Sequence, residues 1–527
     1  MKRMGKSILT TSMVSVAALV LAACGGGSEA EVTSSGGTTS GEPVAGGTAS
    51  ILMMTEPTSL DPAKLTVGYS GSAPVGTSLY GTLFTQDLTT YELIPSIGES
   101  LTSTDGGKTF DLKLRPGVTF SDGSALNAEA VKFNWDRMKN PELGSASLGT
   151  AAQVTATKVV DDLTMQFTMG VPNPNFGQGI TVSSLNWVAS PAALKKGSEE
   201  FDANPIGAGP FTLKSWIRQD KMDLTKNPSY WNAPKPYLDS ITIRTVLDSA
   251  QRLNNLQADS VDVVVDNKAD NTQKAEAAGY GTYQVMLNGG NGFALNFRKA
   301  PFDDPRVREA FVKAIDISLI NEVVYEGVAE LPTSLFNADA PFYTGTQITQ
   351  FNATEAQALF DEISAEQGSP VAITLTAYSL PPSNTVAQAI QAQMSAYKNV
   401  TVKVEEFDFP TAQSKSLSGD FQAMSAGTNF LDPETQMYTW FHGDSKGNTS
   451  GINDPVLNDA LNTGRQATDL AERKDAYAIA QDRITSLNPY LWYVSPQGFF
   501  WTGKKFGGGI EYYGNGSLVT EGLWMQS

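Results

Sequence analysis

Histidine and cysteine are almost absent from this chain of 527 residues, which contains one of each, Cys24 and His442. With no second cysteine there is no intrachain disulfide, and a cysteine-based or histidine-rich zinc site is excluded by count. His442, in a Trp-Phe-His-Gly-Asp context, is better explained as a satisfied or exposed loop side chain than as a general base. We therefore expect no cofactor, no metal centre and no enzymatic activity.

Basic side chains are also scarce, because 37 Lys and Arg face 55 Asp and Glu, a net charge of −18. Proteins that bind nucleic acid neutralise phosphates with Lys and Arg, so this balance argues against a nucleic-acid partner. It argues equally against broad adhesion to anionic lipid. Beyond the N-terminus, no stretch is long and apolar enough to span a bilayer.

The N-terminus of the chain has the features of a targeting signal. Lys2, Arg3 and Lys6 precede an uncharged apolar run that ends in Leu-Ala-Ala-Cys at Cys24. The charge, length and small residues are typical of a secretory signal, residues 1–23. The last four residues resemble a bacterial lipobox, in which the cysteine is lipidated; an ordinary signal peptide with a cysteine nearby is the alternative. We expect an extracytoplasmic protein anchored to the cell membrane through Cys24.

Residues 24–47 predict a flexible tether, because Gly, Ser, Thr and Glu without aromatic residues cannot bury enough apolar surface to fold. From Thr48 the sequence alternates between strand and helix patterns. Alternating apolar residues predict four strands, at 109–115, 164–169, 371–375 and 400–404. Helical spacing predicts helices after Pro305, with an Asp304 cap, after an Asn384 cap, and across 477–487. This mixture indicates an α/β fold. The best internal hinges are Asn288–Gly292 and Asn488–Pro489.

Seven phrases of the sequence, in order, resemble the family 5 extracellular solute-binding proteins of ABC importers, the peptide- and nickel-binding type. The most specific is the block 112–123, Leu-Lys-Leu-Arg-Pro-Gly-Val-Thr-Phe-Ser-Asp-Gly. The others begin with Ser59-Leu60-Asp61-Pro62 and end with the segment from Asp304 to Asp316. The resemblance covers the chain from about Thr48 almost to its C-terminus.

The resemblance implies a two-lobe periplasmic-binding-protein-like fold of type II, in the large peptide-binding class, with an extra subdomain in lobe I. We expect lobe I at 48–295, including an inserted subdomain at about 90–215, lobe II at 296–488, and a return to lobe I at 489–527. It further implies a monomeric receptor that closes on a small organic or peptide ligand. The receptor would deliver this ligand to an ABC permease and ATPase complex.

One position departs from the family pattern. Peptide-binding members carry an aspartate in a phrase like Ala-Asp-Tyr-x-Asp-Pro, and that carboxylate faces the peptide ammonium. This chain has Asn429 at that place, followed by Phe430 where tyrosine is usual. An amide supplies no counter-charge, so we expect a neutral, sugar-like or modified-peptide ligand rather than free peptides.

Aromatic residues that stack on such a ligand are expected among Tyr69, Trp187, Phe430 and Trp440, although each of them could equally belong to the core. Two other functions stay open at this point. One is an extracellular hydrolase, for example a glycosidase with two carboxylates, although nothing among 55 acids identifies such a pair. The other is a receptor for a metal chelate such as nickel.

Overall fold

The computed structural model describes residues 41–526 of the chain. The signal peptide, Cys24 and the tether up to residue 40 lie outside the described residues. The predicted mixture of strands and helices is confirmed, and the strands form three main sheets.

The largest sheet has seven strands in the order β12-β18-β11-β1-β10-β9-β8. Its strands are β1 (Thr48–Met53), β8 (Phe211–Ile217), β9 (Lys221–Lys226), β10 (Ser240–Thr245), β11 (Val263–Asp266), β12 (Gly281–Met286) and β18 (Gln497–Thr502). At its centre β1 runs parallel to both β10 and β11, and the other pairs are antiparallel. All four residues of β11 are buried, as expected for a strand covered on both faces.

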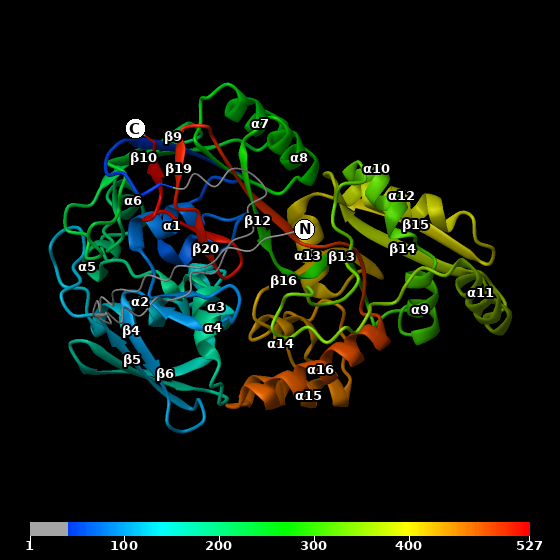
Figure 1. Cartoon of the computed structure of the whole chain (residues 1–527). Coiled ribbons are helices and arrows are strands. Elements are labelled where there is room, and N and C mark those ends of the chain that lie inside the picture. The colour runs from blue at the N-terminus through cyan, green and yellow to red at the C-terminus, as the bar shows by residue number, and fades with distance from the viewer. Residues whose placement is uncertain (1–40, 527) are drawn as a thin grey trace, which may run out of the picture. The chain divides into compact units, whose positions relative to one another are not determined.

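The second sheet has five strands in the order β15-β14-β16-β13-β17. They are β13 (Asn288–Leu295), β14 (Val371–Tyr378), β15 (Val400–Phe407), β16 (Ala423–Phe430) and β17 (Tyr490–Val494). Both strands predicted here, at 371–375 and 400–404, are confirmed, and they pair in parallel from Val371 opposite Val400. Helix α12 (Ser383–Met394) packs on these two strands (Figure 1).

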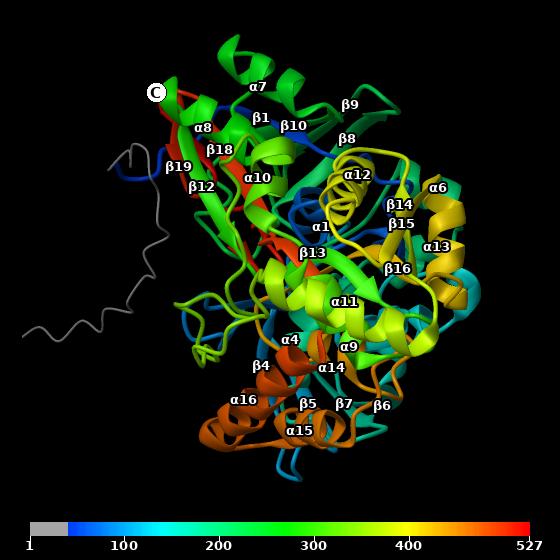
Figure 2. The ribbon, with the colours of Figure 1, turned by 90° about the vertical axis from the view of Figure 1, so that its right-hand side faces the viewer.

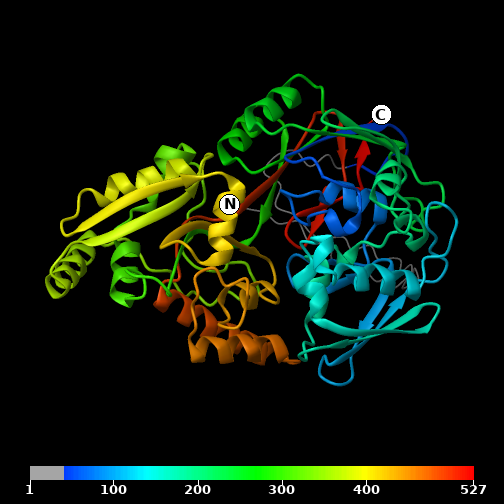
Figure 3. The same ribbon diagram turned by 180° about the vertical axis from the view of Figure 1, so that it is seen from behind.

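The third sheet is antiparallel, with the order β4-β5-β7-β6. It comprises β4 (Gly98–Thr102), β5 (Thr109–Leu114), β6 (Val154–Asp161) and β7 (Thr164–Met169). In β5 and β7 every apolar residue is buried and the polar residues between them are less buried, as the alternating patterns predict. Helix α2 (Ala128–Met138) packs on β6 and β7, seen from behind in Figure 3. This layer forms the inserted subdomain, and β8 returns the chain to the seven-stranded sheet.

The remaining elements connect and cover these sheets. The helices are α1 (Ala73–Tyr80), α3 (Leu148–Ala152), α4 (Phe176–Thr181), α5 (Pro191–Leu194), α6 (Ser198–Ala203), α7 (Ser249–Gln257), α8 (Ala269–Ala277), α9 (Pro305–Lys313), α10 (Ile317–Tyr325), α11 (Ala353–Gln367), α13 (Phe409–Ser418), α14 (Gln436–Phe441), α15 (Pro455–Gln466) and α16 (Leu470–Leu487). Short strand pairs are β2 (Phe84–Gln86) with β3 (Leu93–Pro95), β19 (Phe506–Gly508) with β22 (Trp524–Met525), and β20 (Glu511–Tyr513) with β21 (Ser517–Val519).

All three predicted helices are confirmed, as α9, α12 and α16. The side chain of Asp304 accepts a hydrogen bond from the backbone N–H of Arg306 and caps α9, which packs beside α11 (Figure 2). The late helix α16 covers the predicted segment and begins earlier, at Leu470. The Asn384 cap is wrong, because α12 begins at Ser383 and Asn384 lies inside its first turn.

The chain crosses between the seven-stranded and five-stranded sheets twice. It passes from β12 to β13 at Leu287, and from β17 back to β18 at Ser495–Pro496 (Figure 1). We propose these crossings as the lobe boundaries, which gives a first lobe of 48–287 and 496–526 and a second lobe of 288–495. They differ from the predicted boundaries because β13 pairs along its whole length with β16, a strand of the second lobe.

Trp187 lies in the hydrophobic core of the first lobe. Its side chain is 0% exposed, and a Cβ at Gly76 of α1 would lie 2.6 Å from its indole ring. The glycine therefore leaves room for the ring, and Trp187 presents no surface to a ligand.

We predict that Trp187→Ala lowers the free energy of unfolding by about 3–5 kcal/mol, as truncation of a fully buried aromatic side chain does. Chemical denaturation followed by circular dichroism measures the loss. Leu417→Ala is the matched control, because Leu417 is 77% exposed. A loss of ligand affinity without loss of stability would contradict the assignment to the core.

Candidate functional site

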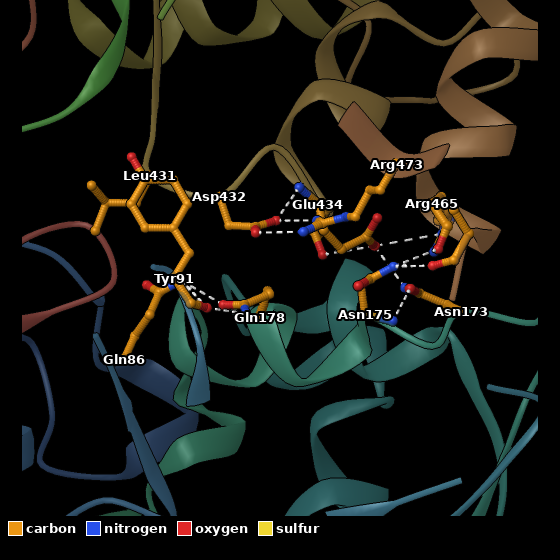
Figure 4. Close-up of polar contacts among 12 residues, drawn as sticks. Gln86, Tyr91, Asn173, Asn175, Gln178, Leu431, Asp432, Glu434, Arg465 and Arg473 are labelled. Atoms are coloured by element: carbon orange, nitrogen blue, oxygen red, sulfur yellow. Dashed lines mark hydrogen bonds and ion pairs between the residues drawn. The ribbon is translucent and has the colours of Figure 1, made fainter. Parts of the chain in front are cut away.

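The segment after β16 reaches from the second lobe to the first. The Glu434 carboxylate oxygen Oε1 accepts a hydrogen bond of 2.6 Å from Asn173 Nδ2 in the inserted subdomain (Figure 4). Asn175 Nδ2 donates to the backbone carbonyls of Arg465 and Ala467, at 3.2 and 3.0 Å. We call this zone the interlobe seam: Leu431–Thr435, Arg465 and Arg473 of the second lobe, with Tyr91, Asn173 and Asn175 of the first.

Two ion pairs hold the second-lobe side of the seam. Arg473 of α16 binds both carboxylate oxygens of Asp432, with 2.8 Å between Nη1 and Oδ2. Arg465 Nε lies 3.5 Å from Glu434 Oε1. Burial raises the pKa of the Glu434 carboxyl, against the opposing effects of Arg465 and Arg473. On the first-lobe side, the partners of these charged groups are the neutral amides of Asn173 and Gln153.

A second contact across the seam involves Tyr91, whose hydroxyl accepts a hydrogen bond of 3.2 Å from Asn288 Nδ2 of β13. The same amide donates to the Leu431 carbonyl at 2.7 Å. On the first-lobe side, Gln178 of α4 donates to the Tyr91 carbonyl (Figure 4). Burial raises the pKa of the Tyr91 hydroxyl, so it stays neutral at physiological pH. The start of β13 and the end of β16 are therefore both fixed against the first lobe.

Strand β16 has a free edge along its second half. Its partner β13 pairs with it from Ala423 to Phe430. On the other side, β14 pairs with it only at Ala423 and Met424. From Ser425 onward, the described part of the chain supplies no strand partner on that side. Free backbone groups of this kind can accept an added extended segment.

Asn429 lies on this half of β16, beside an exposed glycine. Gly427 is exposed, and a Cβ built on it would lie 2.7 Å from Asn291 Oδ1 and 3.6 Å from Asn429 Oδ1. Asn291 and Asn429 thus flank Gly427 from two neighbouring strands. Asn429 is half-buried, and its buried Oδ1 has no hydrogen-bond partner. A buried acceptor without a donor costs about 1–3 kcal/mol.

The predicted aromatic residues do not form one group. Phe430 is 0% exposed and packs with the half-buried Trp440, at 6.0 Å between ring centroids. Tyr69 lies in the first lobe over Gly498 of β18, where burial raises its pKa to about 12. Tyr69 and Trp440 keep exposed surface, whereas Phe430 and Trp187 do not. The part of these residues in ligand binding stays a prediction, and Cys24 lies outside the described residues.

His442 is buried rather than exposed. Its ring stacks on Tyr438 at 4.2 Å, and its Nδ1 accepts a hydrogen bond of 3.1 Å from the Asp444 backbone N–H. Burial lowers the pKa of its imidazole, which keeps the ring neutral. Its Nε2 is buried without a partner. The prediction of a fully satisfied or exposed ring is therefore wrong in that detail.

A cavity of about 370 Å³ adjoins the seam. The first lobe lines it with α3, Gln153 and Ser183, and the second lobe with α14, the loop Ser445–Gly447 and Arg465. Its size falls in the range of pockets that hold small ligands. Between residues 41 and 526, no cluster of three or more His, Cys, Asp or Glu side chains could hold a metal ion. No helix there could cross a membrane either.

Most residues of the seam carry no signal that sequence reasoning could use. Asp432 belongs to a phrase that resembles the family, but its partner Arg473 lies in a helix 41 residues later. Asn173 and Glu434 are 261 residues apart. Only the fold brings them together.

We predict that Asn173→Ala weakens the seam, because Glu434 loses a hydrogen-bond donor to a buried carboxylate. The free energy of unfolding of the variant should be about 1–3 kcal/mol lower than that of wild type. Without ligand, the variant should also show a larger radius of gyration in small-angle X-ray scattering. Asn254→Ala, on the exposed face of α7, is the control. Identical scattering and melting of Asn173→Ala and wild type would contradict the prediction.

The chain is similar in sequence to curated proteins over most of its length. Over 469 residues, the chain is 28% identical to the glutathione-binding protein GsiB of Pectobacterium atrosepticum, which covers 86% of this chain and 89% of that protein. The GsiB protein of Escherichia coli (strain K12) is 26% identical over 438 residues, 80% of this chain and 84% of that one.

Two solved structures share the fold, each with a TM-score of 0.77 and 22% identity. One is the periplasmic binding protein AgaA of A. tumefaciens R10 in complex with agropinic acid, and it matches 91% of this chain and 99% of its own. The other is DppA of Helicobacter pylori in complex with the peptide STSA, and it matches 92% and 99%. The two-lobe periplasmic-binding-protein fold with an extra subdomain in lobe I is confirmed.

Residues 92–448 match the family described as bacterial extracellular solute-binding proteins, family 5 Middle. The relatives are named as glutathione-binding proteins, and DppA is described as an ABC transporter-associated periplasmic binding protein. The chain therefore belongs to the family 5 bacterial extracellular solute-binding proteins, the receptors that serve ABC importers.

Proposed function

We propose that this chain is an extracytoplasmic receptor that captures a peptide-like or other polar organic solute between its lobes and delivers it to an ABC permease and ATPase complex. The relatives are named for glutathione, and the solved structures hold agropinic acid and a peptide. The fold thus accepts ligands of differing chemistry, and side chains at the site must select among them.

The observation that carries the proposal is the unpartnered Asn429 Oδ1 at the free edge of β16. A ligand that lies along this edge can satisfy the backbone groups of β16 by strand addition. A ligand N–H or O–H can satisfy Asn429 at the same time. Gly427 is exposed, so a ligand at this edge can reach the backbone beside Asn429.

The amide also favours one class of ligand over another. Hydrogen bonds to charged groups contribute about 1.5–3 kcal/mol, against about 1 kcal/mol for neutral ones. A carboxylate at position 429 would gain that difference from a ligand ammonium, and Asn429 does not. We therefore propose a ligand whose donor at this point is neutral, as in a modified peptide or a sugar-like solute. Tyr69 and Trp440 are the aromatic residues proposed to contact it.

A hydrolase finds less support in the arrangement of acids. Asp432 and Glu434, the buried acids of the seam, are paired with Arg473 and Arg465. A glycosidase needs one carboxyl group to give up a proton and the other to act as base or nucleophile at the substrate. Both acids are buried and bound by side chains of the protein itself, so neither is presented to a substrate. No contact favours the metal-chelate alternative over a metal-free ligand.

We predict that Asn429→Asp raises the preference for free amines about tenfold, since this corresponds to about 1.4 kcal/mol. Isothermal titration calorimetry with glutathione, trialanine and their N-acetyl derivatives measures the ratio in wild type and variant. Asn254→Asp adds the same charge on exposed α7 and should leave the ratio unchanged.

An unchanged ratio in Asn429→Asp would place residue 429 outside the site. The receptor itself would be contradicted if peptides, peptide derivatives, sugars and metal chelates all failed to raise the melting temperature. A ligand at 100 times its dissociation constant should stabilise the protein by about 2.7 kcal/mol.

We also propose that Cys24 carries the lipid anchor and that residues 25–47 act as the tether. Because the anchor and the binding site are separate, Cys24→Ser should release the protein into the soluble fraction and leave ligand affinity unchanged. Membrane fractionation and calorimetry of the same preparation check both halves. A variant that stays with the membrane, or that loses affinity on release, would contradict the proposal.

A further inference from the structure

The cavity beside the seam differs in charge from the rest of the molecule. Acidic residues outnumber basic ones in the chain, 55 to 37. The residues that line this cavity nevertheless include two bases, Lys446 and Arg465, and no Asp or Glu. A concave, partly desolvated site with charge of one sign concentrates ions of the opposite sign.

Lys446 brings a charge that the protein does not balance. It is exposed at the cavity, between Ser445 and Gly447, and it forms no ion pair within the described part of the chain. The ammonium group is therefore free to bind an anion that enters the cavity.

Arg465 brings a fixed and buried charge. Its side chain is 7% exposed, and its guanidinium donates to Gln153 and lies 4.5 Å from the centre of the Tyr438 ring. Its Nε has no hydrogen-bond partner and only the 3.5 Å ion pair with Glu434.

The other lining residues are neutral hydroxyl and amide groups from both lobes. They include Thr150 and Gln153 of the first lobe and Gln436 and Thr439 of the second. Such groups can donate to the several lone pairs of a carboxylate without adding charge. Both lobes must be in place for the set to be complete.

We infer that this cavity binds an acid group of the imported solute, with Lys446 as its main charged contact and Arg465 behind it. The class of ligand is thus a polar organic acid. This inference rests on the proposed function, because the acid group belongs to the solute held between the lobes. The inference adds that the solute must carry a negative charge, a requirement that does not follow from Asn429.

Acid and neutral forms of the same compound test the inference. The pairs are N-acetyl-Ala-Ala with its C-terminal amide, and glutathione with its glycyl monoethyl ester, titrated by calorimetry. Wild type should bind each acid form about tenfold more tightly. Lys446→Gln should reduce that ratio to about threefold or less, and Lys446→Arg should keep it.

The matched control is Lys474→Gln, which removes the same charge from the exposed face of α16 and should leave the ratio as in wild type. Equal binding of acid and neutral forms by wild type overturns the inference, and so does an unchanged ratio in Lys446→Gln. In both cases binding itself persists, so the receptor function stands. If no member of either pair binds, the inference is overturned as well, and failure of the wider ligand panel would then contradict the receptor function too.

Discussion

The buried ion pair between Asp432 and Arg473 fixes the segment on which the seam depends. Both carboxylate oxygens bind the guanidinium, and Oδ1 also accepts a hydrogen bond of 2.7 Å from the Glu434 backbone N–H. The pair therefore sets the position of Glu434, which in turn meets Asn173 of the other lobe. Removal of one partner from a buried pair costs about 3–5 kcal/mol, because the other charge is left without compensation. The end of β16 and the wall of the cavity both follow from this one contact.

Local patterns predicted the secondary structure well where one face of an element is buried. The strands β5, β7 and β15 alternate because each covers a core on one side only, and β14 alternates over its first half, Val371–Leu375. The cap of α9 could be predicted because an aspartate followed by proline fits few other conformations. The Asn384 cap failed for a related reason, since Ser383 and Asn384 are both common at helix starts and the local sequence does not decide between them. The lobe boundaries depend on strand pairing, which the local sequence does not contain.

The site was only partly accessible from sequence. Asn429 could be found because a family phrase surrounds it. The structure adds that its side-chain oxygen is buried without a hydrogen-bond partner. Aromatic residues were harder, because a large ring in a core and one at a binding surface have the same local sequence. Trp187 proved to fill space beside a glycine, whereas Tyr69 and Trp440 retain some surface. No sequence pattern marks Lys446. It becomes a candidate only because the fold places neutral residues of the other lobe in the same cavity.

The two crossings between the sheets run side by side rather than far apart. Strand β12 pairs with β18 in one sheet, and β13 pairs with β17 in the other. Two adjacent strands joined by hydrogen bonds resist shear and twist far more than they resist bending across their width. We expect any motion of one lobe against the other to be close to a rotation about this pair of crossings. When a ligand fixes the two lobes, little conformational entropy is then lost. Most of the free energy of the ligand contacts is therefore available for affinity.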